Sequence, residues 1–208
     1  MVKKQERTLE EKEAGYKGTA AKLITQYTKG AGFGMAPAIT PGSLFTGRFE
    51  FQAVTDPKEQ LKLTKFGISY TKKPLYFKGA FKYKAGDNFV DGSDKNDVKE
   101  NTGDKDQCGI YALLYEATNE KEEEVILDGN TITNSEYRVA IAQIKDGSDT
   151  EDKWVEFNEA FTYFEGKVYD SSKKYKMAIV CSSSKAGDSF KGAVNSTLFV
   201  DELEIIGE

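Results

Sequence analysis

Much of the chain alternates between apolar and polar residues with a period of two, which is the pattern of half-buried β-strands. The clearest example is residues 75–84, where every second position on one face is aromatic or glycine: Phe77, Gly79, Phe81 and Tyr83. Residues 43–54 alternate in the same way, with Phe45, Gly47, Phe49 and Phe51 on one face. Each segment is therefore predicted to be a strand that turns one face toward a core.

Further strands are predicted at residues 22–27, 108–116, 120–126, 137–144, 154–164, 175–181 and 196–206. Both faces of 108–116 are apolar, so both are expected to be covered. Turn signals such as Asp128-Gly129 separate these segments, and no helix of conventional length and no fixed-period repeat is evident. Nine or ten strands at this spacing predict an all-β fold, a two-sheet antiparallel β-sandwich.

The domain organisation follows from where apolar residues begin. Residues 1–14 are almost all charged or polar, so they are predicted to form a charged N-terminal tail or linker. Residues 15–208 are predicted to form one domain, because this length is enough to bury a full core. Within it, residues 86–107 form a long polar loop of the kind that is often functional or mobile.

Composition excludes several classes of function. The net charge is −5 and the isoelectric point is about 5.1, which disfavours binding to nucleic acid or to an anionic membrane surface. There is no run of 18 apolar residues, so no membrane insertion of this segment is expected. The start of the chain lacks the apolar stretch of a signal peptide, which fits either a cytosolic protein or a mature or truncated form.

The chain contains no histidine, which removes the usual Ser-His-Asp and Cys-His catalytic sites and histidine-ligated zinc. Its two cysteines, Cys108 and Cys181, each lie in an apolar strand-like segment. Buried free thiols are the favoured interpretation, because free cysteine behaves as a small hydrophobic residue. A disulfide between them remains the alternative.

Several aromatic residues of the central strands suit carbohydrate, because sugar C–H faces pack on rings while hydroxyls need polar partners. These are Tyr76, Tyr83, Tyr111, Tyr115 and Trp154, and Lys82 lies among them. The alternative is that the rings fill the sandwich core and that Lys82 points outward.

Two polar features near the C-terminus allow similar alternatives. The serine run at residues 182–184 and Asp188 could bind hydroxyl groups of a polyol or could form a turn. Asp201 shares a strand face with Phe199 and Leu203, which would place it on the core side. A carboxylate there would need a cation or a backbone donor, so Asp201 is a weak candidate for calcium.

Glycoside hydrolysis usually needs two carboxyl groups flanking the scissile bond. Glu202 and Glu204 share a strand face, but no Glu-x-Asp-x-Glu or Glu-x-Asp-x-x-Glu strand, as in jelly-roll glucanases, is present. The acidic run at residues 122–124 is typical of a solvated edge. No catalytic residues are therefore assigned.

Eight short motifs occur in an order that resembles one known family, the putative carbohydrate metabolism domain family of Bacteroidetes. They cover most of residues 15–207 and lie at residues 18–20, 43–49, 66–74, 75–86, 106–108, 154–157, 182–192 and 196–203. The most specific are SSS-x-x-G-D-x-F-x-G, which here begins at Ser182, and STL-x-VDEL, which begins at Ser196. The chain departs from the family pattern at Ala20, at Ile68-Ser69 and at Phe81.

The resemblance implies a jelly-roll sandwich with a sugar-binding pocket on a concave sheet face. It also implies an extracytoplasmic protein of the cell surface or periplasm, a lipoprotein in full length, often with an upstream immunoglobulin-like domain. Enzymatic activity is not implied, and no cofactor is expected apart from the possible calcium.

Together these observations predict a non-catalytic module that binds an oligo- or polysaccharide. The expected ligand-binding residues are Lys82, Tyr83, Asp106, Tyr111 and Trp154, with Ser182, Ser184 and Asp188 at the rim. A glycoside hydrolase that uses Asp and Glu on the concave face is the alternative function. A structural surface or adhesin module, with the aromatics in its core, is the second alternative.

Overall fold

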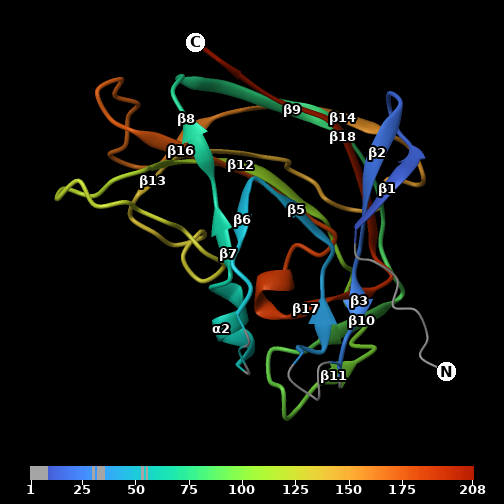
Figure 1. Ribbon diagram of the computed structural model, residues 1–208. Coiled ribbons are helices and arrows are strands. Elements are labelled where there is room, and N and C mark those ends of the chain that lie inside the picture. The colour runs from blue at the N-terminus through green and yellow to red at the C-terminus, as the bar shows by residue number, and fades with distance from the viewer. Residues whose placement is uncertain (1–8, 30, 32–35, 53, 55) are drawn as a thin grey trace.

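The computed structural model of the protein is built almost entirely from β-strands (Figure 1). It describes residues 9–29, 31, 36–52, 54 and 56–208. Among the described residues, the only helical segments that extend over several residues are α2 (Pro57–Leu61) and a 3-10 turn (Gly187–Ser189). No helix in the described part of the chain is long and apolar enough to cross a membrane.

Two antiparallel sheets form the body of the molecule. The first sheet has the order β1 (Leu9–Ala14), β2 (Thr19–Ile24), β18 (Thr197–Gly207), β9 (Pro74–Lys84) and β14 (Val155–Ala160). The second sheet has the order β15 (Thr162–Tyr163), β13 (Arg138–Gln143), β12 (Gly109–Glu116), β16 (Tyr175–Ser182) and β5 (Ser43–Phe45), and β8 (Ile68–Tyr70) also pairs with β16.

Three small sheets lie around this body. One consists of β11 (Lys99–Glu100), β10 (Asn88–Asp91) and β17 (Lys191–Val194). The others are the pair β3 (Gln26–Tyr27) and β4 (Ile39–Thr40) and the pair β6 (Gly47–Phe49) and β7 (Thr64–Phe66).

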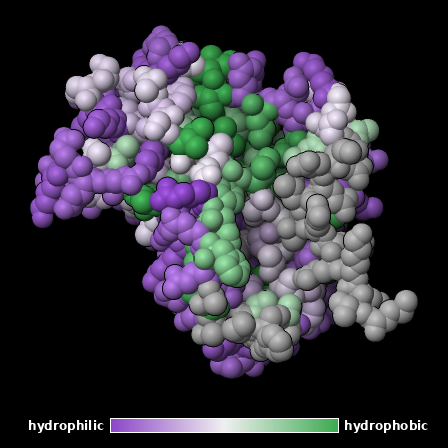
Figure 2. Space-filling model, viewed as in Figure 1, coloured by the Kyte–Doolittle hydropathy of each residue, from purple (hydrophilic) through white to green (hydrophobic). Residues whose placement is uncertain are grey.

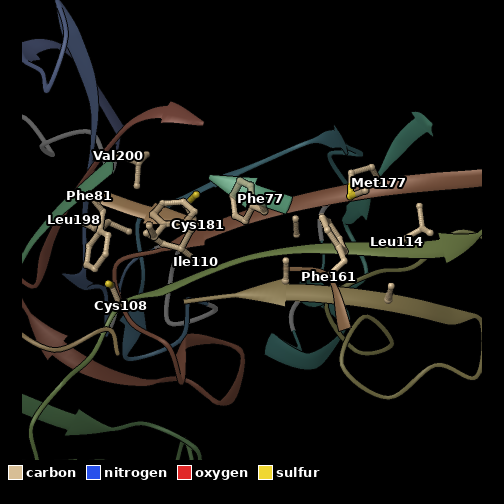
Figure 3. Packing of buried hydrophobic residues seen from close by; sticks show 14 of the residues in the cluster. Phe77, Phe81, Cys108, Ile110, Leu114, Phe161, Met177, Cys181, Leu198 and Val200 are labelled. Atoms are coloured by element: carbon tan, nitrogen blue, oxygen red, sulfur yellow. The ribbon is translucent and has the colours of Figure 1, made fainter. Parts of the chain in front are cut away.

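The main core fills the space between the two large sheets (Figure 3). Phe77, Phe81 and Leu198 of the first sheet pack in one cluster with Ile110 and Met177 of the second. Burying each such side chain contributes on the order of 2 kcal/mol. The prediction of an all-β, two-sheet antiparallel sandwich is confirmed, and so is the alternation within β9.

Both cysteines are buried and free, as favoured from their apolar neighbours. Cys108 and Cys181 belong to the main core, where Figure 3 shows them among the apolar side chains. Burial raises the pKa of both thiols, so both remain uncharged and unreactive at neutral pH.

The outer face of the second sheet is also covered, as expected from the apolar character of both faces of β12. Leu113 and Tyr115 point into a second cluster together with Val125 and Leu127 from the long connection after β12. The predicted strand at 120–126 is wrong, since this connection forms only two isolated bridges, one between Thr118 and Glu124 and one between Leu127 and Phe66. Its apolar residues serve as a cover for the sheet.

The prediction of one continuous strand over residues 43–54 is also wrong. The chain turns away from the second sheet after Phe45. The Thr46 hydroxyl there accepts a hydrogen bond from the Ile179 amide in the middle of β16, and Gly47 adopts a φ of +145°. Its second half therefore pairs with β7, and Phe49 and Phe51 are 57% and 88% exposed. Figure 2 shows apolar surface over this part of the molecule.

The predicted tail at residues 1–14 ends earlier than expected. Residues 9–14 form the edge strand β1, which is hydrogen-bonded to β2. Backbone hydrogen bonds to β2 hold this edge strand in place, so it forms although its sequence has few apolar residues. Residues 1–8 of the predicted tail lie outside the described residues.

Candidate functional site

The residues predicted to form one binding site lie in three separate places. Asp106, Ser184 and Tyr83 are in the interior. Tyr111 and Ser182 lie on the outer side of the second sheet, with Asp188 nearby. Lys82 and Trp154 lie together beside the first sheet.

Asp106 is the centre of a buried hydrogen-bonded cluster and is only 4% exposed. Its Oδ2 atom accepts hydrogen bonds from the Ser184 hydroxyl at 2.6 Å, the Ser196 hydroxyl at 2.7 Å and the Ala193 amide at 2.7 Å. Its Oδ1 atom accepts a bond from the Gln107 amide at 2.9 Å. Such a carboxylate is tolerated inside a protein because its oxygens are fully supplied with donors.

Two further hydroxyls extend this cluster. Thr25 shares hydrogen bonds of 2.7 Å with Ser183 and 2.6 Å with Ser184. Ser183 also accepts a bond of 2.9 Å from the Gly42 amide. We call Thr25, Asp106, Ser183, Ser184 and Ser196 the buried hydroxyl cluster. It joins four loops. Because its polar groups bond to one another, they have little capacity left to bind a ligand.

Tyr83 lies next to this cluster and is completely buried. Burial, together with the nearby Asp106 carboxylate, raises the pKa of its hydroxyl far above the usual value. In this structure the Tyr83 ring packs in the main core and has no exposed surface on which a sugar could stack.

The predicted residues beside the second sheet are only partly accessible. Tyr111 is half-buried against the second apolar cluster, and burial together with the nearby Asp188 carboxylate raises its pKa. The Ser182 hydroxyl donates to the Ser184 carbonyl at 2.9 Å, which is the turn interaction that its sequence context allowed. Asp188 is exposed in the 3-10 turn.

The outer face of the first sheet brings Lys82 and Trp154 together with residues from other strands. Lys22 on β2, Phe199 on β18 and Lys82 on β9 are direct partners across three neighbouring strands. Trp154 continues this line, because the next residue begins β14 and pairs with Phe81, the residue before Lys82.

The rings and cations of this line are in mutual contact. The Trp154 and Phe199 ring centroids are 6.5 Å apart, and the Tyr16 and Trp154 centroids are 6.1 Å apart. The Lys82 ammonium is 4.8 Å from the Phe199 centroid and 5.9 Å from that of Trp154, and the Lys22 ammonium is 5.8 Å from Phe199. These are cation–π distances. We call Tyr16, Trp154, Phe199, Lys22 and Lys82 the aromatic row.

A shallow hollow of about 410 Å³ adjoins the aromatic row on the same face of the sheet. Tyr16 belongs to both, since it lines the hollow and its hydroxyl donates to Glu156. That hydrogen bond raises the pKa of the Tyr16 hydroxyl. The polar residues that line the hollow are Tyr16, Lys17, Lys78, Glu156, Asn158, Glu202 and Glu204.

Asp201 lies beside Phe199 on the outer face and not on the core side, so that part of the prediction is wrong. Its two oxygens accept the Lys17 and Glu202 amides, each at 2.9 Å. Glu202 adopts a φ of +53° at a bulge, and the bulge turns Leu203 into the core. Strict alternation fails at this point because the bulge inserts one extra residue.

A metal site is not evident in the described part of the chain, where no three Asp, Glu or Cys residues are grouped as ligands. Calcium at Asp201 therefore stays a prediction.

Three members of the aromatic row, Tyr16, Lys22 and Phe199, were not predicted from the sequence. Each belongs to a different strand or turn, and only the pairing of β2, β18, β9 and β14 places them side by side. The alternation within each strand predicts which face of the sheet a residue occupies, but it does not predict which residue of the adjacent strand lies beside it.

Comparison with known proteins agrees with the motif resemblance. Residues 2–206 match the model of the "Putative carbohydrate metabolism domain" family. No match was found among curated proteins.

Two solved structures are similar over nearly the whole chain. One is described as a "putative glycoside hydrolase" from Bacteroides thetaiotaomicron VPI-5482; it is 37% identical, with a TM-score of 0.84, over 97% of this chain and 57% of that chain. The other, with the same description, is from Bacteroides vulgatus ATCC 8482; it is 32% identical, with a TM-score of 0.80, over 97% of this chain and 78% of that chain. The chain thus spans little more than half of the first of these proteins. It belongs to the putative carbohydrate metabolism domain family.

Proposed function

We propose that this domain binds carbohydrate on the outer face of the first sheet, at the aromatic row and the hollow beside it. The observation that carries the proposal is that three aromatic rings are in successive contact, next to a hollow lined by polar side chains. Membership of a carbohydrate metabolism family supports it.

The two parts of this surface offer what a sugar needs. Tyr16 is 39% exposed and Trp154 is half-buried, so their rings retain surface on which the C–H face of a sugar can pack. In the hollow, Glu156 and Asn158 provide hydrogen-bond acceptors, and Lys17 and Lys78 provide donors. Ligand sites combine apolar surface with a few fixed polar groups in this way.

This site keeps Lys82 and Trp154 from the sequence prediction. It does not include Tyr83, Asp106 and Ser184, because their side chains are buried in the interior. Binding is proposed as non-catalytic, since stacking and hydrogen bonding at an open surface require no chemical step.

The test is affinity electrophoresis and a glycan array with the wild type and Trp154→Ala. We expect glycan binding to be lost in Trp154→Ala, because the ring on which the C–H face of the sugar packs would be removed. The matched control is Phe51→Ala, which deletes an aromatic ring that is 88% exposed and remote from the row. Binding that survives Trp154→Ala unchanged would contradict the proposed site.

We also propose that the protein works outside the cytoplasm, on glycans at the cell surface, as part of a longer lipoprotein. The resemblance to chains of greater length from Bacteroides supports the presence of a further domain, for which an immunoglobulin-like fold is our expectation. Protease digestion of intact cells, followed by detection of this domain with an antibody, tests the location.

Glycoside hydrolysis is the second candidate, favoured by the three glutamates that line the hollow: Glu156, Glu202 and Glu204. The names given to the two similar structures agree with it. Release of reducing sugar by the wild type, lost in Glu156→Gln while binding is retained, would support hydrolysis. Binding without any release of reducing sugar over the same range of glycans would favour the binding function.

A further inference from the structure

We propose that the bound glycan is a neutral chain of several sugar units that lies along β9, from Trp154 at one end to Tyr76 at the other. This inference rests on the proposed function and names the class of ligand for the same surface. It also assigns Tyr76, which the proposed site does not use, as a second residue on which a sugar stacks.

The outward positions of β9 define the line that such a chain would follow. Every second side chain of β9 points to the outer face of the first sheet, because the alternate ones, such as Phe77 and Phe81, belong to the main core. In order along the strand, the outward residues are Lys82, Ala80, Lys78 and Tyr76. Residues two apart in a strand are separated by about 7 Å, so this line is about 20 Å long. A chain of several sugar units can cover this distance, whereas one unit cannot.

The hollow of about 410 Å³ lies in the middle of this line, since Ala80 and Lys78 both line it. Ala80 has the shortest outward side chain of β9, which fits a hollow at this point. The strands on either side of β9 in Figure 1 supply the flanking residues, which are Glu156 and Asn158 on β14 and Glu204 on β18. Their side chains offer donors and acceptors to the hydroxyls of the middle sugar units.

Aromatic rings lie at both ends of the line. Trp154 is half-buried beside Lys82 at one end. At the other end, Tyr76 is 42% exposed, and its partners on the neighbouring strands are Ala160 and Ile206. These three residues form a continuous apolar surface across three strands, on which the C–H face of a second sugar can pack. Apolar surface next to fixed polar groups is typical of ligand sites.

The charged side chains along the line are paired, which favours a neutral ligand. The pairs are Lys17 with Glu202 at 3.3 Å, Lys78 with Glu204 at 2.8 Å, and Lys82 with Asp152 at 3.0 Å. Because each of these lysines already has an anionic partner, they do not select a carboxylate or sulfate group. An ammonium group has several donors and a carboxylate has several lone pairs, so a paired group can still bond to a sugar hydroxyl.

The experiment is isothermal titration calorimetry of the wild type with disaccharides and hexasaccharides of one backbone at a time. The neutral series are xylo-, manno-, laminari- and malto-oligosaccharides, with oligogalacturonates as the acidic comparison, and any glycan bound on the array is added to them. We expect a neutral hexasaccharide to bind at least about tenfold more tightly than its disaccharide, because only the longer ligand contacts both ends of the line. Oligogalacturonates should bind no more tightly than the neutral series.

Substitutions of Tyr76 locate the far end of the site. Tyr76→Ala should weaken binding of the hexasaccharide about tenfold and leave the disaccharide unaffected, because the short ligand stacks on Trp154. Trp154→Ala should weaken both. Tyr76→Phe keeps the ring and should restore the hexasaccharide affinity. The matched control is Tyr27→Ala, which removes a tyrosine that is 39% exposed on β3, outside the first sheet, and should leave both affinities unchanged.

The failures of the two proposals are distinguishable. Equal affinity for disaccharide and hexasaccharide, or a hexasaccharide affinity that Tyr76→Ala leaves unchanged, would overturn the extended ligand. The proposed function would still stand if Trp154→Ala abolished binding. Equal weakening by Tyr76→Ala and Tyr27→Ala would also overturn the extended ligand, because the effect would not be specific to this line.

The charge of the ligand has its own outcome. Tighter binding of oligogalacturonates than of every neutral series would overturn the neutral ligand and leave the proposed function standing. A folded wild type that binds no glycan, by calorimetry or on the array, would overturn both proposals.

Discussion

The buried hydroxyl cluster and the aromatic row each contain residues that the sequence predicted to bind a ligand, but the two regions use them in opposite ways. In the cluster, the hydroxyls of Ser184 and Ser196 donate to Asp106 at 2.6–2.7 Å, so the polar groups satisfy one another inside the protein. In the row, Trp154 and Lys82 retain exposed surface on one side of a sheet. The difference shows that polar residues of a family motif, such as Ser184 and Ser196, can serve the fold instead of a ligand.

The largest expected effect is on the stability of the cluster. Asp106→Ala should lower the free energy of unfolding by about 3–5 kcal/mol, because it leaves three buried donors without their acceptor. Urea denaturation followed by tryptophan fluorescence measures this. Asp188→Ala, at an exposed carboxylate, is the control and should change stability by no more than about 0.5 kcal/mol. Equal effects of the two substitutions would contradict the contrast between cluster and surface.

A second substitution tests the packing of the cluster without removing a polar group. A Cβ atom at Gly192 would lie 2.4 Å from the Ser184 Oγ atom and 3.4 Å from an Asp106 oxygen. Gly192→Ala should therefore lower the free energy of unfolding by about 1–3 kcal/mol. The control is Gly109→Ala, where the nearest atom would be 3.6 Å away. If both variants melt at the same temperature, the cluster is less tightly packed than the structure indicates.

The aromatic row should show the reverse response. Trp154→Ala is expected to abolish glycan binding while it lowers the free energy of unfolding by only about 1 kcal/mol, since the ring is half-buried. Parallel measurements of glycan binding and of urea denaturation separate the two effects, with unfolding followed by circular dichroism because Trp154 is the single tryptophan. Loss of several kcal/mol would assign Trp154 to the fold and not to a ligand surface.

The smallest expected effect is a pH dependence of the free energy of unfolding that arises in the small sheet of β11, β10 and β17. The Lys191 ammonium, at 2.8 Å, together with the Ser93 hydroxyl and amide, lowers the pKa of Asp91 from 3.8 to about 2. A lowered pKa in the folded state stabilises the protein above pH 3.8, and this contribution is lost as the pH falls toward 2.

The wild type should therefore exceed Asp91→Asn in stability at pH 5, by less than about 1 kcal/mol because the pair is partly exposed. The difference should shrink toward zero as the pH falls to about 2. Thermal melts at a series of pH values measure it, with Asp97→Asn as the control for removing a nearby exposed charge. A difference that is constant with pH would show that the ion pair does not act as described.

The sequence predicted local features of the fold well. Alternation within β9 correctly assigned Phe77 and Tyr83 to one face and Lys82 to the other, because side-chain direction in a strand depends only on position. It failed at residue 47, where a glycine and the side chain of Thr46 redirect the chain, and at Asp201, where a bulge breaks the period.

The site was less predictable because it depends on contacts between distant segments. Asp106 is buried by Ser184 and Ser196, which follow it by 78 and 90 residues. Nothing near Asp106 in the sequence indicates these partners. Likewise, the line from Lys22 through Phe199 to Lys82 exists only because β18 lies between β2 and β9.

That central position of β18 has a consequence for how the domain folds. The strand at residues 197–207 separates β2 from β9, so the first sheet remains split until this late segment has left the ribosome. Such a domain has a high contact order and is expected to fold slowly, on the millisecond-to-second scale. Slow completion would leave the facing edges of β2 and β9 unpaired for longer, and unpaired strand edges favour aggregation.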